Sequence, residues 1–357
     1  MRKNVLHIIN SLTVGGAEML LVNTLTPGGL QDHTNNILVY LNKHSTLPEK
    51  LDKGVKVIDL GYTSFLKLPV VLRKLKKIIK ENNIDIIHSH LTPAGFYARM
   101  AAPRKIMQVH TLHTTYSDDR ETRGILKWME RIFLFKHKGT SLIFLSALLR
   151  SNFLSHVNFK GPSFILANFA EDSFFIEKEI IFPNDKFNIV AVGSFRPPKN
   201  YPYLLKISGF LKNSNIHFYI YGGGGTRQVQ KIIQEEGLPV TLMGQQDNIS
   251  EVLQNYCLFI MTSTREGYPL TVIEAMAAKL PCFLSDIPTL KDIAGENALY
   301  FCLHDAEAVA KQVRALSVNA EFLRSIAEKG HAFALKNGIR GKYIKELLNI
   351  YNAVLSS

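Results

Sequence analysis

Short apolar runs of strand length alternate with helix-like segments along the whole chain, and this alternation runs through twice. The first series predicts strands at 5–9, 36–41, 55–60, 84–88, 107–112 and 141–145, and helices at 17–25, 68–81, 94–102 and 124–137. Strands that alternate with helices form a parallel sheet covered on both faces, because each parallel crossover needs a helix-length connection. Such sheets bind their ligands beyond the carboxyl ends of the strands.

A polar stretch between residues 168 and 185 interrupts this series and is typical of a linker. The second series predicts strands at 187–192, 217–221, 240–243, 258–261 and 282–285, and helices at 203–210, 226–236, 249–255, 270–278 and from 306 to the end. The chain has 357 residues, whereas single cores rarely grow beyond roughly 250–300 residues. We therefore expect an α/β protein with two Rossmann-like domains, residues 1–170 and 171–340, facing across a cleft.

The composition is that of an ordinary globular protein, with 46% hydrophobic and 20% charged residues. No apolar run reaches the ~20 residues that span a bilayer. The run at residues 5–9 is too short for a signal peptide and lacks a small-residue cleavage site after it, so we interpret it as the first strand. Cys257, Cys282 and Cys302 are odd in number and lack metal-ligand spacing, which indicates a reduced, cytoplasmic chain without a disulfide framework.

The positive charge is confined to the first half of the chain. Residues 1–170 carry 23 Lys and Arg against 11 Asp and Glu, and residues 171–357 carry 19 of each, so the first half holds the whole net charge of +12. This predicts an anionic partner, namely nucleic acid, anionic lipid or a phosphorylated acceptor. No nucleic-acid reading motif is present, so we expect no nucleic-acid partner. The basic side of the helix from Leu68 to Lys80 faces either solvent or an anionic membrane, and both interpretations stay open.

Two glutamates, Glu266 and Glu274, lie eight positions apart around the predicted junction of strand 258–261 and helix 270–278. Pro269 is predicted at the first helical position, where its missing N–H has no helical partner to lose. Glu266 then lies in the loop after the strand, and Glu274 about one turn into the helix. Because the N–H groups of a helix start form an anion site, a carboxylate on either side suits a ligand with hydroxyl groups around a phosphate, such as a nucleotide sugar.

A longer pattern surrounds these glutamates. It comprises Thr262-Ser263, Ala275-Met276-Ala277, Leu280-Pro281 and Ser285-Asp286-Ile287-Pro288. The whole string closely resembles the E-x7-E region of the retaining glycosyltransferases of family 4, also called glycosyl transferases group 1. That resemblance covers nearly the whole chain and implies the GT-B fold, in which the last helix, here 341–357, crosses back onto the first domain. The chain departs from the family at Lys279, where Gly is usual, and at Ser194, where Arg is usual.

The resemblance implies a nucleotide-sugar donor bound mostly by the second domain. Glu274 would accept hydrogen bonds from the ribose hydroxyls, and Glu266 would hold hydroxyls of the transferred sugar. The backbone around Gly267, Tyr268, Pro269 and Leu270, together with Lys199 and Arg196, would stabilise the charge on the leaving diphosphate. A solvated loop with two surface cations is the alternative interpretation of Lys199 and Arg196.

The remaining predicted site residues lie at the end of a strand or just after it. They are Gly15, Gly16, Gly193, Gly222 and Met243 for donor binding, and His113. Glycines let the backbone approach a phosphate or sugar closely, although they also make ordinary turns. His113 matches the family's histidine near the reacting sugar, where a neutral imidazole could donate a hydrogen bond. The alternative is a loop histidine with water partners.

The function that the resemblance implies is a retaining, metal-independent glycosyltransferase. It would move a sugar from a UDP- or GDP-sugar to a lipid-linked or polysaccharide acceptor in bacterial cell-surface glycan biosynthesis, with Glu266, His113, Lys199 and Arg196 as catalytic residues. No Asp-x-Asp occurs, so we expect no metal and no cofactor. We expect a cytoplasmic location, with peripheral membrane contact through the basic first domain as an option. The alternatives are a nucleotide-sugar epimerase of GT-B fold and a catalytically inactive nucleotide-sugar-binding subunit.

Overall fold

A computed structural model shows the fold and describes residues 2–13, 15–42, 51, 54–62, 67–115, 139–175, 182 and 185–356. The chain forms two compact units. Unit 1 comprises Met1–Asn168 and Arg340–Ser357, and unit 2 comprises Phe169–Ile339. The sequence places the corresponding boundaries after residues 170 and 340.

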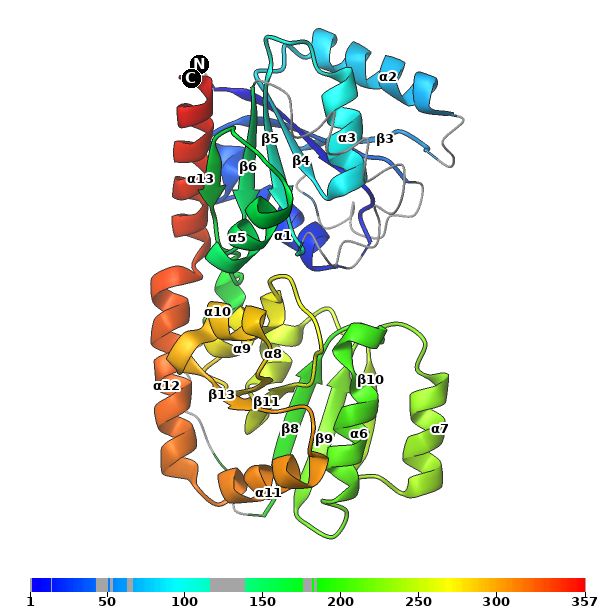
Figure 1. Ribbon diagram of the computed structural model, residues 1–357, viewed down its shortest axis with the longest axis vertical. Helices are drawn as coiled ribbons and strands as arrows, with labels where there is room; N and C mark the ends of the chain where they lie inside the picture. Colours follow the sequence, from blue (N-terminus) through cyan, green and yellow to red (C-terminus); the bar gives the residue numbers. More distant parts are fainter. Residues whose placement is uncertain are drawn as a thin grey trace. The chain divides into compact units, whose positions relative to one another are not determined.

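Unit 1 is built on a seven-stranded parallel sheet with the order β3-β2-β1-β4-β5-β6-β7 (Figure 1). The strands are β1 (Asn4–Ile9), β2 (Asn35–Tyr40), β3 (Lys56–Asp59), β4 (Ile86–His90), β5 (Met107–Leu112), β6 (Thr140–Phe144) and β7 (Ser163–Ile165). The described helices are α1 (Gly16–Thr24), α2 (Leu68–Glu81), α3 (Thr92–Ala101), α5 (Ala147–His156) and α13 (Arg340–Leu355). Because the order runs outwards from β1 in both directions, the sheet is doubly wound.

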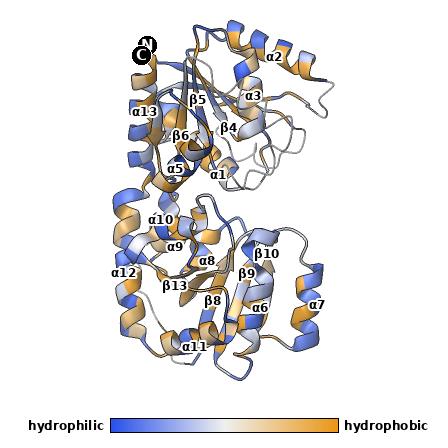
Figure 2. Ribbon diagram, viewed as in Figure 1, coloured by the Kyte–Doolittle hydropathy of each residue, from blue (hydrophilic) through white to orange (hydrophobic). Residues whose placement is uncertain are grey.

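Helix α2 is amphipathic, as the sequence predicts. Val71, Leu75 and Ile79 are buried in a core shared with β1, β4 and α3. The exposed basic residues of the helix are Arg73, Lys74, Lys76, Lys77 and Lys80. Figure 2 shows orange and blue residues alternating within the turns of this helix. The apolar side therefore packs inward, which leaves the basic side at the surface.

The C-terminal helix α13 packs within unit 1. The Tyr351 hydroxyl is fully buried and lies 2.7 Å from Nδ1 of His88 on β4. At the start of the helix, Nη1 of Arg340 donates to the Thr26 hydroxyl at 2.8 Å. The chain thus leaves unit 1, forms unit 2 and returns, which confirms the predicted return of the last helix.

Unit 2 repeats the architecture with a six-stranded parallel sheet in the order β10-β9-β8-β11-β12-β13. The strands are β8 (Phe187–Val192), β9 (Ile216–Tyr221), β10 (Val240–Gly244), β11 (Leu258–Met261), β12 (Cys282–Ser285) and β13 (Leu299–Phe301). The helices are α6 (Tyr201–Gly209), α7 (Arg227–Glu236), α8 (Ile249–Leu253), α9 (Leu270–Ala277), α10 (Pro288–Ala294), α11 (Ala306–Ser317) and α12 (Ala320–Asn337). Buried aromatic side chains of Phe187, Phe218 and Phe259 fill both faces of the sheet.

The predicted pair of parallel-sheet, Rossmann-like units is confirmed. The sequence missed α5, β7, α10 and β13, and it ended β4 two residues early, because Ser89 and His90 are polar yet continue the buried ladder. The predicted helix 124–137 lies outside the described residues. Among the described helices, none combines the length and the apolar character that crossing a membrane requires.

Candidate functional site

The loop between β8 and α6 turns at the carboxyl end of the unit 2 sheet. The N–H of Gly193 donates to the Tyr221 carbonyl at 2.8 Å, and the Tyr201 hydroxyl donates to the Gly193 carbonyl at 2.8 Å. A short 3-10 turn, Pro197–Lys199, follows, and Asn200 takes a left-handed conformation with φ 52° before α6 begins. These contacts hold the loop against both flanking elements, and they place Lys199 at the carboxyl end of the sheet.

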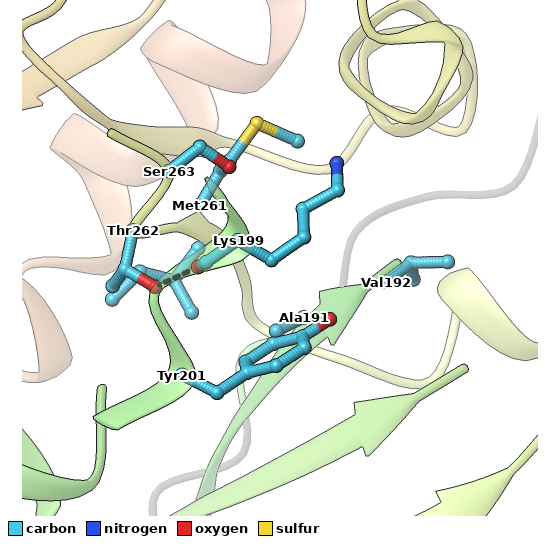
Figure 3. Close-up of a pocket in the computed structure, with 8 residues that line it drawn as sticks. Ala191, Val192, Lys199, Tyr201, Met261, Thr262 and Ser263 are labelled. Atoms are coloured by element: carbon cyan, nitrogen blue, oxygen red, sulfur yellow. Dashed lines mark hydrogen bonds between the residues drawn. The ribbon is translucent and has the colours of Figure 1, made fainter. Parts of the chain in front are cut away.

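Lys199 is paired with the first glutamate of the motif. Its Nζ lies 2.8 Å from Oε1 of Glu266, and the two side chains are only 18% and 13% exposed. The Ser263 hydroxyl donates to the same carboxylate oxygen at 2.7 Å, while the Thr262 hydroxyl donates to the Lys199 carbonyl at 3.0 Å (Figure 3). Ser285 at the end of β12 donates to the Ser263 carbonyl at 2.6 Å. The ends of β11 and β12 therefore position this ion pair.

A small recess lies beside the pair, between the ends of β8 and β11. Its lining residues are Ala191, Val192, Lys199, Tyr201, Ile260, Met261, Thr262 and Ser263. In Figure 3 the Lys199 side chain extends between Ser263 and Met261 on one side and Val192 on the other. The recess thus combines an apolar floor with one cation and three hydroxyl groups, at the carboxyl ends of the strands where α/β folds bind ligands.

Helix α9 follows β11 at the carboxyl end of the sheet. The prediction that Pro269 is its first helical residue is wrong. Pro269 is the N-cap of the helix, with φ −70° and ψ 115°, and Leu270 is the first helical residue. The extended ψ of Pro269 lets its carbonyl accept from the Val272 N–H at 3.2 Å, as an N-cap carbonyl does. The sequence also missed Thr271, whose hydroxyl is buried and has no hydrogen-bond partner among the described residues. The start of α9 therefore offers backbone N–H groups to an anion.

Glu274 lies one turn into α9. Burial raises the pKa of its carboxyl, the nearby Glu171 adds to this rise and Lys199 opposes it, which leaves the pKa at about 8. The carboxyl is therefore largely protonated near neutral pH, and a protonated carboxyl both donates and accepts hydrogen bonds. This suits a ligand that presents hydroxyl groups.

Gly193 and Gly222, both predicted to bind the donor, lie in contact with each other in unit 2. Gly222 follows β9, and a Cβ atom there would collide with the carbonyl oxygen of Gly193. The two glycine turns therefore pass each other at backbone contact, which only glycine at 222 permits. Met243 lies half-buried near the end of β10. Arg196 is exposed at the start of the 3-10 turn, and its backbone carbonyl accepts from the Lys199 N–H at 3.0 Å.

The other predicted site residues belong to unit 1. Gly15 is the N-cap of α1, where a Cβ atom would collide with the Glu18 carboxylate, and Gly16 is the first helical residue. His113 follows β5, with its ring centroid 5.7 Å from that of His90. Burial, reinforced by His110, lowers the pKa of His113 to about 3, so the imidazole is neutral.

Lys279, where the sequence departs from the family pattern, ends helix α9 in a left-handed conformation with φ 55°. The Leu280 N–H donates to the Ala275 carbonyl at 2.9 Å, and the Lys279 N–H donates to the Met276 carbonyl at 3.1 Å. This is a Schellman cap, whose left-handed residue is usually glycine. The left-handed backbone conformation therefore explains the glycine that is usual in the family. Lysine adopts the same conformation here at some cost in folding free energy.

Solved structures show which fold the chain has. A glycosyltransferase from Rickettsia africae superposes with a TM-score of 0.83 at 17% identity, over 99% of both chains. HepE from Anabaena, solved in complex with UDP and glucose, superposes with a TM-score of 0.80 at 14% identity, over 99% of this chain and 100% of that one. The chain therefore has the GT-B fold of glycosyltransferases.

Sequence comparisons name the family. Residues 6–170 match the model described as Glycosyltransferase Family 4, and residues 172–333 match the model described as Glycosyl transferases group 1. Between them the two models cover most of the chain, which belongs to the glycosyl transferases group 1 family. The capsular polysaccharide biosynthesis glycosyltransferase CapH of Staphylococcus aureus is 26% identical over 76% of this chain and 78% of its own length. The EpsF protein of Bacillus subtilis (strain 168) is 25% identical over 98% of this chain and 97% of its own length.

Proposed function

We propose that this glycosyltransferase uses a nucleotide-diphosphate sugar, a UDP- or GDP-sugar, and that unit 2 binds it. The observation that carries the proposal is the partly buried Lys199–Glu266 pair at the sheet edge, beside the start of α9 and Glu274 within that helix. A diphosphate needs a cation and N–H donors, and the sugar and ribose need carboxyl groups. This edge of unit 2 supplies all three.

Each residue then has a chemical role. Lys199, Arg196 and the backbone N–H groups of Tyr268 and Leu270 stabilise the charge that develops on the leaving diphosphate. Because Glu266 and Thr262 already hold Lys199 in place, little reorganisation is needed during the reaction, and such preorganised electrostatics is usually the largest catalytic contribution. Glu266 holds the transferred sugar, and Glu274 binds the ribose hydroxyls.

We propose retention of configuration without a divalent metal. The bond between the anomeric carbon and the phosphate oxygen breaks, and the acceptor oxygen bonds to the same face of the sugar. The acceptor proton passes to the leaving phosphate, which acts as the base. Lys199 supplies the positive charge that a metal supplies in other sugar transferases. The neutral imidazole of His113 donates a hydrogen bond to the reacting sugar.

For the acceptor we propose a lipid-linked or otherwise anionic glycan, in the assembly of a bacterial surface polysaccharide. One relative, 25% identical over 63% of both chains, is an Escherichia coli α-1,3-galactosyltransferase that uses UDP-Gal and an α-D-GlcNAc-diphosphoundecaprenol acceptor. The net charge of +12 lies in the first half of the chain, and the exposed basic side of α2 belongs to it. We propose that this side contacts the anionic cytoplasmic face of the membrane, while catalysis takes place in the cytoplasm.

The experiment is a transfer assay with labelled UDP- and GDP-sugars and a lipid extract of bacterial membranes as the acceptor source, in chelator. We expect one nucleotide sugar to label the lipid fraction, with an α-anomeric product from an α-linked donor. Activity that disappears in chelator and returns with Mn²⁺ contradicts metal independence. A product of inverted configuration contradicts retention. A nucleotide sugar that is only epimerised, without transfer, contradicts the function.

A further inference from the structure

Three histidines lie together on one face of the unit 1 sheet. His88 and His90 are two positions apart on β4, so their side chains share a face, and His7 on β1 pairs in register with His88. All three side chains are at most 2% exposed. One ring nitrogen from each residue lies within 4.8 Å of the others. The fold therefore gathers three buried imidazoles where a sheet core normally holds apolar side chains.

The hydrogen bonding of this trio is incomplete. Neither ring nitrogen of His90 has a hydrogen-bond partner among the described residues, and Nδ1 of His7 has none there either. The other nitrogen of His7 lies 3.2 Å from Oδ1 of Asn36. Buried polar atoms in folded proteins nearly always have partners, and an exception calls for an explanation such as an unseen ion.

His88 is held from both sides. Its Nδ1 lies 2.7 Å from the Tyr351 hydroxyl of α13, and its Nε2 lies 2.8 Å from the Thr111 hydroxyl of β5. Metal-binding histidines usually keep one ring nitrogen in such a hydrogen bond, which fixes the ring orientation while the other nitrogen binds the ion. One of the two hydroxyl contacts can serve this purpose when the ion replaces the other.

We propose that His7, His88 and His90 bind a divalent transition-metal ion, with zinc as the preferred ion. Imidazole is a typical zinc ligand, whereas calcium and magnesium require oxygen ligands, and no carboxylate belongs to the described trio. Zinc–nitrogen bonds of about 2.0–2.1 Å in a tetrahedron put ligand nitrogens about 3.3 Å apart. Rotation of the rings has to close the remaining gap. Three imidazoles leave the fourth position for a water molecule.

All three proposed ligands belong to unit 1, whereas the Lys199–Glu266 pair belongs to unit 2. The His90 ring is a neighbour of His113, with 5.7 Å between the ring centroids. The ion would join β1 to β4. Its role is therefore structural, and transfer that proceeds in chelator does not exclude it.

The test uses untagged full-length protein, stripped with chelator, reloaded with zinc and passed over a desalting column. We expect about one zinc ion per chain by mass spectrometry of the metal, and a rise in Tm on loading. Cobalt in place of zinc should give the visible absorption band of a tetrahedral nitrogen site. The matched variants are His90→Phe, which keeps a flat ring without ligand atoms, and His33→Phe at an exposed histidine of the same unit.

Zinc retained by the wild type and by His33→Phe, but lost by His90→Phe, supports the site. One of Tyr351→Phe and Thr111→Val should weaken zinc affinity by about 10–100-fold, because it removes the hydroxyl that orients His88. Equal zinc content in His90→Phe and the wild type overturns the proposal. If His90→Phe does not fold, the wild type decides: a chain that retains no zinc and gives no cobalt band overturns the proposal.

Discussion

Replacing Glu274 with Gln should make unit 2 more stable at alkaline pH, although it removes a proposed ligand-binding carboxyl. The structure buries this carboxyl, and its pKa rises from the ordinary 4.5 to about 8. An acid whose pKa is raised in the folded state binds more protons when folded than when unfolded between these two values. The free energy of unfolding of the wild type therefore falls as the pH rises from 4.5 to 8. Gln carries no titrating proton and lacks this dependence.

The magnitude follows from the size of the shift. Each pKa unit corresponds to about 1.4 kcal/mol, so the stability advantage of Glu274→Gln over the wild type should grow by roughly 3–5 kcal/mol between pH 4.5 and 8. Lys199 opposes the shift and Glu171 reinforces it. Glu171→Gln should therefore lower the pKa of Glu274, since it removes the neighbouring negative charge. The pH range over which the wild type loses stability then becomes narrower.

The assay is urea unfolding of the wild type, Glu274→Gln and the exposed control Glu251→Gln at pH 5, 6, 7 and 8. If the two units unfold separately, the effect belongs to the transition of unit 2. We expect the free energy of unfolding to fall by the same amount between pH 5 and pH 8 in the wild type and in the control. It should fall less in Glu274→Gln. A difference between Glu274→Gln and the wild type that stays constant from pH 5 to pH 8 refutes the argument from burial.

Three further substitutions test the candidate site and its supports. Lys199→Met should weaken nucleotide-diphosphate binding by roughly 10–100-fold, the worth of a hydrogen bond to a charged group, whereas the exposed control Lys206→Met should not; equal titration-calorimetry affinities contradict the role of Lys199. Lys279→Gly should raise the Tm by a few degrees, because it relieves about 1 kcal/mol at a left-handed residue; a lower Tm contradicts this. Gly222→Ala should destabilise unit 2 by at least ~2 kcal/mol in urea through its collision with the neighbouring backbone, whereas Gly225→Ala, with open space around it, should cost little.

Some elements could be predicted to the residue, and others could not. Strands 107–112, 187–192, 258–261 and 282–285 are apolar runs with clear boundaries, and the structure has them at these positions. By contrast, β7 (Ser163–Ile165) has only three residues, none of them fully buried, so no apolar run marks it.

The site shows a similar division. Resemblance to the family identified Lys199 and Glu266 separately, but only the fold brings these two residues, 67 positions apart, into an ion pair. The pairing of His7 with His88 likewise depends on the register of β1 against β4, which the sequence does not show. The raised pKa of Glu274 depends on how the side chains pack around α9, and no sequence pattern shows such packing.

The central claim is that unit 2 binds a nucleotide-diphosphate sugar, and a thermal-shift screen tests it most directly. The purified protein is heated with UDP, GDP, ADP, dTDP or CMP in the absence of metal. A ligand at a hundred times its dissociation constant stabilises by ~2.7 kcal/mol, which gives a clear rise in Tm. We predict such a rise with UDP or GDP in the wild type and its loss in Glu274→Ala. No rise with any of the nucleotides, or an equal rise in Glu274→Ala, contradicts the account.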